Sequence, residues 1–220
     1  MKKAIYFMLS TIMFGLLVIS CGCNLNDPSE DTTSTPNWEG DYLISNNDDK
    51  IALSGYTRIT GNLIIESDEN QSFTDLTGLE SLTTVCGGLK IASNDNLTSL
   101  IGLENLTTVC SDLYIDINHN LTSLTGLESL TTVGGLLSIS YNANMTTLTG
   151  LESLTNIGSD LNIVSNTSLI SLNSPWDLSY LGGNLYITDN TILPTSLAKD
   201  FANHLILNGY TGIVTISGNL

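Results

Sequence analysis

A single 24-residue unit is repeated along the middle of this chain, and it restricts the fold more than any other feature. Glycine, glutamate and leucine recur at fixed steps: Gly78, Gly102, Gly126 and Gly150; Glu80, Glu104, Glu128 and Glu152; Leu82, Leu106, Leu130 and Leu154. A constant period of this length is typical of stacked-repeat proteins, in which each unit buries its apolar side against its neighbours. The chain is therefore predicted to fold as a solenoid.

Residues 97–116 show how one coil of this solenoid is built. Aliphatic side chains recur at every third residue: Leu97, Leu100, Leu103, Leu106 and Val109. Neither a helix nor a strand has this period, so the chain must bend through short extended pieces and turns. Leu113 and Ile115 then alternate as in a strand, which leaves no room for a helix of ordinary length.

An asparagine follows each predicted strand at a constant offset. The series consists of Asn94, Asn118, Asn142, Asn166 and Asn190. Stacking would align these residues in a buried ladder. In such a ladder, each amide can bond backbone groups at the turn and the next amide in the column.

The two ends of the repeat region carry helix signals. Polar capping residues precede an apolar pair in residues 47–53, which predicts a short helix. Apolar residues recur every four positions over residues 197–205, between Pro194 and Gly209, which predicts a longer amphipathic helix. The predicted fold is thus mainly β, a single-stranded right-handed β-helix of 24-residue coils with a short N-terminal and a longer C-terminal capping helix.

The N-terminus carries a targeting signal in residues 1–20, a basic start followed by an apolar run. Residues 18–21, Val-Ile-Ser-Cys, resemble the lipobox of bacterial lipoproteins, and this resemblance implies that Cys21 becomes the lipid-bearing first residue. A cleaved signal peptide and a membrane helix are the alternatives, but the run is shorter than the roughly 20 residues that span a bilayer. Residues 21–40 are polar and acidic, which predicts a disordered tether before a solenoid domain over residues 41–220.

The repeat L-x-x-L-x-G-L-E-x-L-T-x-V-G-G-x-L-x-I-x-x-N resembles the receptor L domain, a leucine-rich-repeat-like family, and bacterial surface lipoproteins that carry such repeats. The resemblance covers about residues 41–220. It implies a solenoid used for extracellular recognition. The chain lacks the cysteine-rich modules and intracellular parts that accompany animal L domains, so receptor signalling is not implied.

Charge narrows the range of partners. Beyond residue 20 the chain keeps four basic residues against 22 acidic ones, a formal charge of −18. This balance argues against nucleic acid and against docking on anionic lipid, so only the lipid anchor would contact a membrane. We expect a monomer at the bacterial cell envelope, anchored in the outer membrane and exposed on the surface, that recognises an extracellular protein or glycan.

Catalytic signals are weak. The two histidines, His119 and His204, have no partner pattern of Ser or Cys with Asp, and no Cys and His spacing suits a metal. We therefore expect no enzyme activity, no cofactor and no metal site. A structural envelope protein without a ligand is one alternative. A carbohydrate-active β-helix enzyme is another, although such enzymes need clustered acidic and basic groups and Arg58 is the only arginine.

Two further columns follow from the repeat. Cys86 and Cys110 occupy equivalent positions in successive units, within the range of about 5 Å where a disulfide can form, although two buried thiols are the alternative. The repeated glutamates would form a column of like charges that either splay into solvent or share a cation.

The candidate binding face is the outer side of the predicted strands, because these positions vary while the scaffold positions do not. The first outward series is Lys90, Tyr114, Ser138, Asn162 and Tyr186, and the second is Ala92, Asp116, Ser140, Val164 and Thr188. From these and a neighbouring turn we select Lys90, Tyr114, Asp116, Tyr141 and Tyr186 as candidate ligand contacts. The alternative is that they are solvated strand positions.

Overall fold

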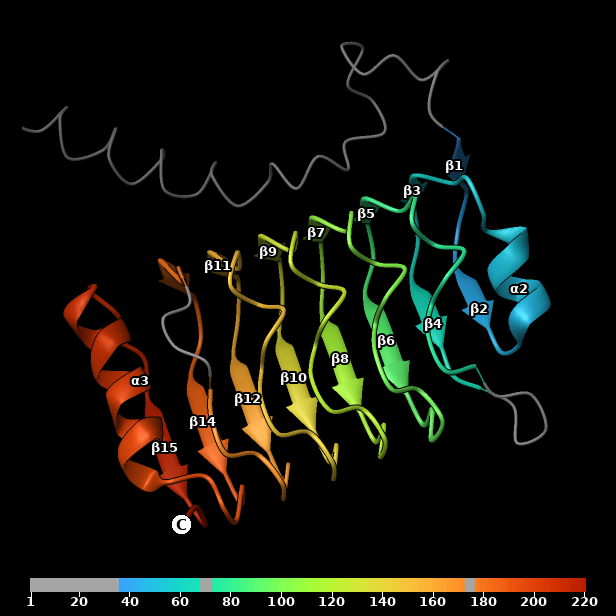
Figure 1. Cartoon of the computed structure of the whole chain (residues 1–220). Helices are drawn as coiled ribbons and strands as arrows, with labels where there is room; N and C mark the ends of the chain where they lie inside the picture. The colour runs from blue at the N-terminus through green and yellow to red at the C-terminus, as the bar shows by residue number, and fades with distance from the viewer. Residues whose placement is uncertain (1–35, 68–72, 173–176) are drawn as a thin grey trace, which may run out of the picture.

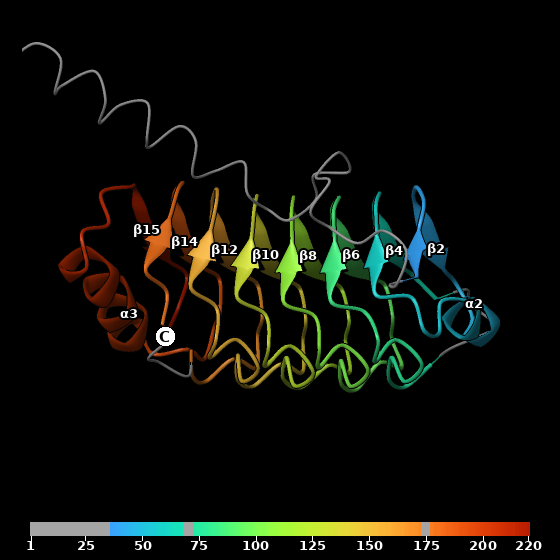
Figure 2. The ribbon, with the colours of Figure 1, turned by 90° about the horizontal axis from the view of Figure 1, so that it is seen from above.

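The computed structural model describes residues 36–67, 73–172 and 177–220, and these form a parallel-strand β-solenoid of about six coils (Figures 1 and 2). The predicted fold class is confirmed: the structure is mainly β, and its few helices are minor caps. The predicted signal segment, Cys21 and most of the predicted tether lie outside the described residues. Within the described ranges, no helix is long and apolar enough to cross a membrane.

The longer strand of each coil contributes to an eight-stranded parallel sheet. Its members are β2 (Tyr42–Ile44), β4 (Leu63–Ile65), β6 (Leu89–Ala92), β8 (Leu113–Asp116), β10 (Leu137–Ser140), β12 (Leu161–Val164), β14 (Leu185–Thr188) and β15 (Val214–Ser217). Equivalent residues pair, as Ile115 does with Ile139, so the repeat fixes the register. Each row of equivalent side chains therefore runs straight across the sheet.

A second, seven-stranded parallel sheet is built from two-residue strands. They are β1 (Asn37–Trp38), β3 (Arg58–Ile59), β5 (Thr84–Val85), β7 (Thr108–Val109), β9 (Thr132–Val133), β11 (Asn156–Ile157) and β13 (Tyr180–Leu181). Sequence reasoning missed these strands because two residues are too few to show a period-two alternation. They lie along the upper edge of the coils in Figure 1.

Residues 37 and 38, within the segment predicted as the tether, form a strand of the described structure. Trp38, inside the predicted tether, stacks edge-on against Tyr42 with ring centroids 4.6 Å apart and against Tyr56 at 5.7 Å. Its strand pairs with β3. A single tryptophan in a polar run gives no periodic signal, but its contacts with two other aromatic rings order the segment.

The core is a set of stacked aliphatic columns. In one coil, Leu121, Leu124, Leu127, Leu130 and Val133 are all fully buried. A single coil is only one strand thick along the stack and cannot enclose these side chains. Their burial therefore depends on the coils above and below. The solenoid is therefore stabilised mainly by contacts between neighbouring coils.

The asparagine ladder runs through the whole stack. Asn94, Asn118, Asn142, Asn166 and Asn190 are buried, and Asn219 extends the series. Asn142 Nδ2 donates to the Ile115 carbonyl at 2.8 Å and to Asn166 Oδ1 at 3.3 Å. The backbone N–H of Asn142 donates to the same Asn166 oxygen at 3.0 Å. Each amide thus joins the turn of one coil to the next amide.

The repeated glutamates bond the repeated glycines. The carboxylate of Glu128 accepts the Gly126 backbone N–H at 2.9 and 3.1 Å, and the other three units repeat this contact. The side chains therefore fold back onto their own coil, a role that neither predicted alternative included. Gly126 has φ +113°, and a Cβ there would overlap the Leu100 carbonyl of the preceding coil. The glycine is required both by its backbone conformation and by the close approach of the coils.

Five successive coils place a non-glycine residue in the left-handed region directly before the ladder asparagine, and Gly218 takes this position before Asn219. These residues are Ser93, Ile117, Tyr141, Ser165 and Asp189, with φ of 57–59°. Asparagine and aspartate tolerate this region, whereas a β-branched residue is strained there. Ile117 is therefore the least suitable member of the column.

We expect Ile117→Asn to raise the free energy of unfolding by about 1 kcal/mol, because asparagine relieves this backbone strain. Urea denaturation followed by circular dichroism measures the change. Ile101→Asn is the matched control, because Ile101 is similarly exposed (45% against 43%) and lacks a positive φ. An equal gain in both variants would show that the stabilisation comes from removing an exposed apolar side chain.

Helices close both ends of the stack (Figure 1). α2 (Asn47–Ala52) starts with a capping box between Asn46 and Asp49, and it places Lys50 against the first coils. Lys50 Nζ donates to the Asp75 carbonyl at 2.9 Å, and burial lowers the pKa of this amine. α3 (Thr195–Leu207) buries Phe201 and Leu205 against the last coil.

Candidate functional site

Four of the five candidate residues lie on the outer face of the eight-stranded sheet: Lys90, Tyr114, Asp116 and Tyr186. Two of them, the tyrosines, belong to one row that crosses four strands. Tyr114, Ser138, Asn162 and Tyr186 pair in register on β8, β10, β12 and β14, and we call them the tyrosine-flanked row. With strands about 4.8 Å apart, the two tyrosines stand roughly 14 Å apart across three strand spacings. Between them the floor is made of two small polar side chains. Figure 2 shows how these strands lie side by side along one long face.

A second row beside it carries an acidic group. Asp116 Oδ1 accepts a hydrogen bond from Ser138 Oγ at 3.0 Å, and the Ser138 and Ser140 hydroxyls are 3.0 Å apart. Burial raises the pKa of Asp116, and the hydrogen bonds from both serines and the charge of Lys90 oppose that rise. The carboxylate is thus held by a local hydroxyl network.

The tyrosine at the N-terminal side of the row is oriented by a neighbouring acid. Tyr114 Oη donates to Asp112 Oδ2 at 3.4 Å. Burial, with the nearby Asp112 charge, raises the pKa of this phenol. The ring of Tyr114 lies on the outer face of β8, where the alternation of the strand places it.

Lys90 lies in register beside Tyr114, and Tyr141 lies at the edge of this surface. Lys90 Nζ pairs with Glu66 Oε2 at 2.9 Å, with both side chains nearly half exposed, so its charge is already balanced. Tyr141 follows β10 with φ +58° and is 56% exposed. It lies in the turn that carries the left-handed column, at the edge of the sheet rather than on it.

Asn162 is a residue that the candidate set missed. Its side chain makes no hydrogen bond with any described residue, and its Oδ1 is buried without a donor. Buried polar atoms are normally paired, so this amide can exchange its present environment for a ligand without losing a protein contact. Its position between two tyrosines on a variable row is the signal that could have revealed it.

The two cysteines of the described residues occupy equivalent positions after β5 and β7. Both Cys86 and Cys110 are disulfide-bonded, and none of the cysteines in the described ranges is free. We propose that they bridge each other across adjacent coils. Such a bridge would fix the register of two neighbouring repeats.

Neither histidine is placed in a catalytic arrangement. His119 lies in an exposed turn, and His204 on α3 contacts Asn208 at 3.1 Å between Nε2 and Nδ2. In the part of the chain that the structure describes, no three or more His, Cys, Asp or Glu residues gather closely enough to hold a metal ion.

In a comparison with known protein families, the receptor L domain model matches residues 56–116. This match confirms the predicted resemblance for that segment, which includes β3 to β8. Receptor L domains are non-enzymatic binding domains that are typically extracellular. No curated protein and no solved structure matches the chain.

Proposed function

From the receptor L domain in residues 56–116 we infer that this protein is a recognition module, and we propose that it binds a glycan on the outer face of the eight-stranded sheet. The observation that carries the proposal is the unpartnered Asn162 between Tyr114 and Tyr186. An amide supplies both a donor and an acceptor for sugar hydroxyls.

The chemistry of the row favours a glycan over a protein partner. The fully buried core of a protein interface is more apolar than the surface around it, whereas Ser138, Ser140 and Asn162 make this floor polar. Tyrosines present a flat apolar ring and a hydroxyl, which suits the mixed apolar and polar faces of a sugar. The two rings would flank the ligand, and the floor would bond its hydroxyls.

The test is binding of the full chain to an immobilised panel of polysaccharides and oligosaccharides. We expect Tyr114→Ala combined with Tyr186→Ala to weaken binding of any glycan hit at least tenfold, about 1.4 kcal/mol, while the melting temperature changes little. Both rings point away from the core, so the fold does not depend on them.

Tyr180→Ala is the matched control, because it also removes a surface tyrosine ring but lies on the seven-stranded sheet. Its glycan affinity should equal that of the unaltered chain. A panel without any hit, alongside saturable binding of a protein that the double variant loses, would assign the same face to a protein ligand. Equal losses of glycan affinity in the control and the double variant would show that the binding site does not lie on this face.

We further propose that the module is lipid-anchored at Cys21 in the bacterial outer membrane and acts at the cell surface in adhesion. The lipobox-like residues 18–21 support this anchor, and the acidic stretch after them supports a tether. The solenoid would then stand away from the membrane and contact it only through the lipid.

Cys21→Ser should release the protein from the membrane fraction and abolish labelling by a fatty-acid analogue. Cys23→Ser is the control, because the residues before Cys23 match the lipobox less well. Retained labelling in the Cys21 variant would place the lipid elsewhere.

A further inference from the structure

The seven-stranded sheet ends one strand short of the eight-stranded sheet. β13 is its last strand, whereas β15 continues the larger sheet beyond β14. Successive ladder asparagines are 24 residues apart along most of the stack, but Asn190 and Asn219 are 29 apart. In this last interval the chain forms α3 where every earlier coil forms a two-residue strand. The edge of β13 therefore faces a position that one further strand would occupy.

Backbone groups on this edge have no partner among the described residues. In five successive earlier coils, the carbonyl equivalent to Ser179 accepts two N–H groups from the next coil, as Thr131 does from Thr155 and Asn156. The carbonyl equivalent to Leu181 likewise accepts one, as Ile157 does from Gly182. Within residues 177–220, no donor reaches either the Ser179 or the Leu181 carbonyl.

The backbone N–H of Leu181 also points toward the open edge of β13. The backbone N–H groups of Tyr180 and Gly182 donate to the Thr155 and Ile157 carbonyls of the preceding coil, and successive residues of a strand present their backbone groups to opposite sides. Further along, the Gly183 carbonyl is occupied, because the Tyr210 hydroxyl donates to it at 3.1 Å. The unpaired edge is thus confined to about three residues, with Tyr210 closing one end.

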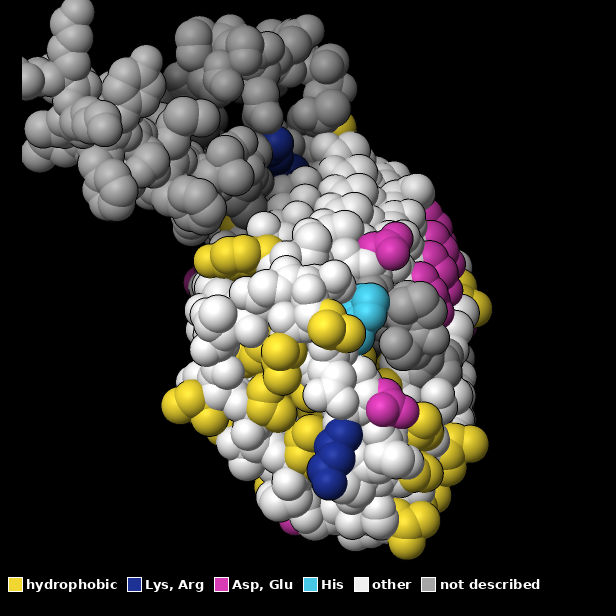
Figure 3. Space-filling view, turned by 90° about the vertical axis from the view of Figure 1, so that its left-hand side faces the viewer, with side chains coloured by type: hydrophobic (Ala, Val, Ile, Leu, Met, Phe, Trp, Pro, Cys, Tyr) yellow, Lys and Arg dark blue, Asp and Glu magenta, His cyan; other side chains and the backbone are white. Residues whose placement is uncertain are grey.

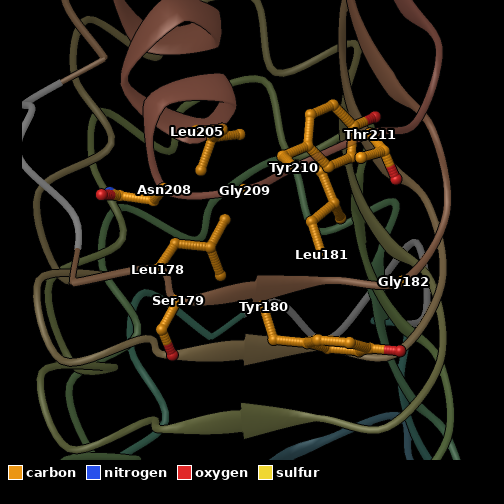
Figure 4. A pocket seen from close by; sticks show the side chains of 10 residues that line it. All are labelled: Leu178, Ser179, Tyr180, Leu181, Gly182, Leu205, Asn208, Gly209, Tyr210 and Thr211. Atoms are coloured by element: carbon orange, nitrogen blue, oxygen red, sulfur yellow. The ribbon is translucent and has the colours of Figure 1, made fainter.

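A cavity of about 240 Å³ adjoins this edge, between β13 and the segment that leads from α3 to β15 (Figure 4). Its lining includes Leu178, Leu181 and Leu205 and contains no charged residue. The volume is below the roughly 300–1,000 Å³ of small-molecule sites, so it suits one or two side chains rather than a cofactor. This end of the stack, seen in Figure 3, carries few charged side chains, in contrast to the acidic chain as a whole.

We propose that this notch binds an extended, uncharged peptide segment of a partner protein, which adds to β13 as a parallel strand. Strand addition to an open sheet edge combines main-chain hydrogen bonds with a pocket for alternate side chains. Here the first two peptide N–H groups would bond the Ser179 carbonyl, and the fourth would bond the Leu181 carbonyl. The third residue would place an aliphatic side chain against Leu181 and Leu205. It corresponds to Val133, which is buried in its own coil.

The chain's own repeat supplies the probe. Acetyl-Thr-Thr-Val-Gly-Gly-amide copies residues 131–135, which form this strand in an inner coil. Added to the isotope-labelled full chain, it should shift amide signals of β13 and of residues 208–211 and slow hydrogen exchange at Leu181 at least tenfold at saturation. A control peptide with N-methylglycine at the fourth position lacks one donor and should bind at least tenfold more weakly.

Two protein variants complete the test. Asn208→Trp, at the exposed end of α3, should obstruct the notch and weaken peptide binding at least tenfold. The Tyr114→Ala, Tyr186→Ala double variant should bind the peptide normally, since its changes lie on the other sheet. Shifts on β1 or on the eight-stranded sheet, or equal binding of both peptides, would overturn the proposal. So would self-association of the chain that the peptide inhibits by competition, because a second copy would then be the occupant of the notch.

Discussion

Replacing Asn142 with leucine should lower the free energy of unfolding by about 4 kcal/mol. The substitution leaves the Ile115 carbonyl and the Asn118 backbone N–H buried without their present partners. It also removes one bond from each neighbouring amide. Each unsatisfied buried group costs about 1–3 kcal/mol, so the sum exceeds what a single hydrogen bond contributes. Urea unfolding monitored by circular dichroism gives the value.

Asn144→Leu makes the same chemical change in the same coil at an exposed position. Asn144 Nδ2 donates to Asn120 Oδ1 at 3.2 Å, where water can replace it. This control should change stability by less than about 0.5 kcal/mol. Similar losses in the two variants would mean that leucine disturbs the coil in general and that the buried ladder has no special energetic role.

The second large effect is expected at Gly126. Gly126→Ala should cost at least about 3 kcal/mol, because alanine is strained at this φ and its Cβ would force the coil away from the Leu100 carbonyl. The loss of close coil spacing would also weaken the neighbouring hydrogen bonds. Thermal and urea unfolding both measure this change.

Gly78→Ala separates the two contributions. Gly78 has nearly the same φ, +112°, and the same glutamate contact, but its Cβ would meet the Lys50 carbonyl only at an ordinary 3.8 Å. We expect a cost of about 1–2 kcal/mol from backbone strain alone. If both alanine variants lost the same amount, the close approach of adjacent coils would contribute nothing measurable.

The sequence predicted the parts of this fold that repeat. The three-residue spacing of Leu97 to Val109, the strand pattern of Leu113 and Ile115, and the two capping helices all report side-chain direction, which periodicity records directly. The order of the N-terminal segment was not predictable, because it depends on Trp38 meeting Tyr56, a contact between separate coils.

The candidate site was predicted only in part, for a related reason. Repeat variation directed attention to Tyr114 and Tyr186, but a side chain's lack of partners, as at Asn162, is a property of three-dimensional surroundings. The left-handed turn that carries Tyr141 was also hidden, because isoleucine and tyrosine, at two of its five positions, are types that do not mark turns. The edge of β13 is open because no further strand pairs with it in the seven-stranded sheet, and no sequence motif marks a missing strand.

The register of the coils also bears on how such a chain can evolve. Because four successive units each carry their own glycine, glutamate and ladder asparagine, recombination within the gene that adds or deletes 24 codons among them would leave both caps and the pattern of neighbour contacts intact. Such an event between Tyr114 and Tyr186 would change their separation by one strand spacing, about 4.8 Å. The separation of the two tyrosines can therefore vary only in multiples of one strand spacing. A single genetic event could thus change the size of ligand that fits between them without first destabilising the fold.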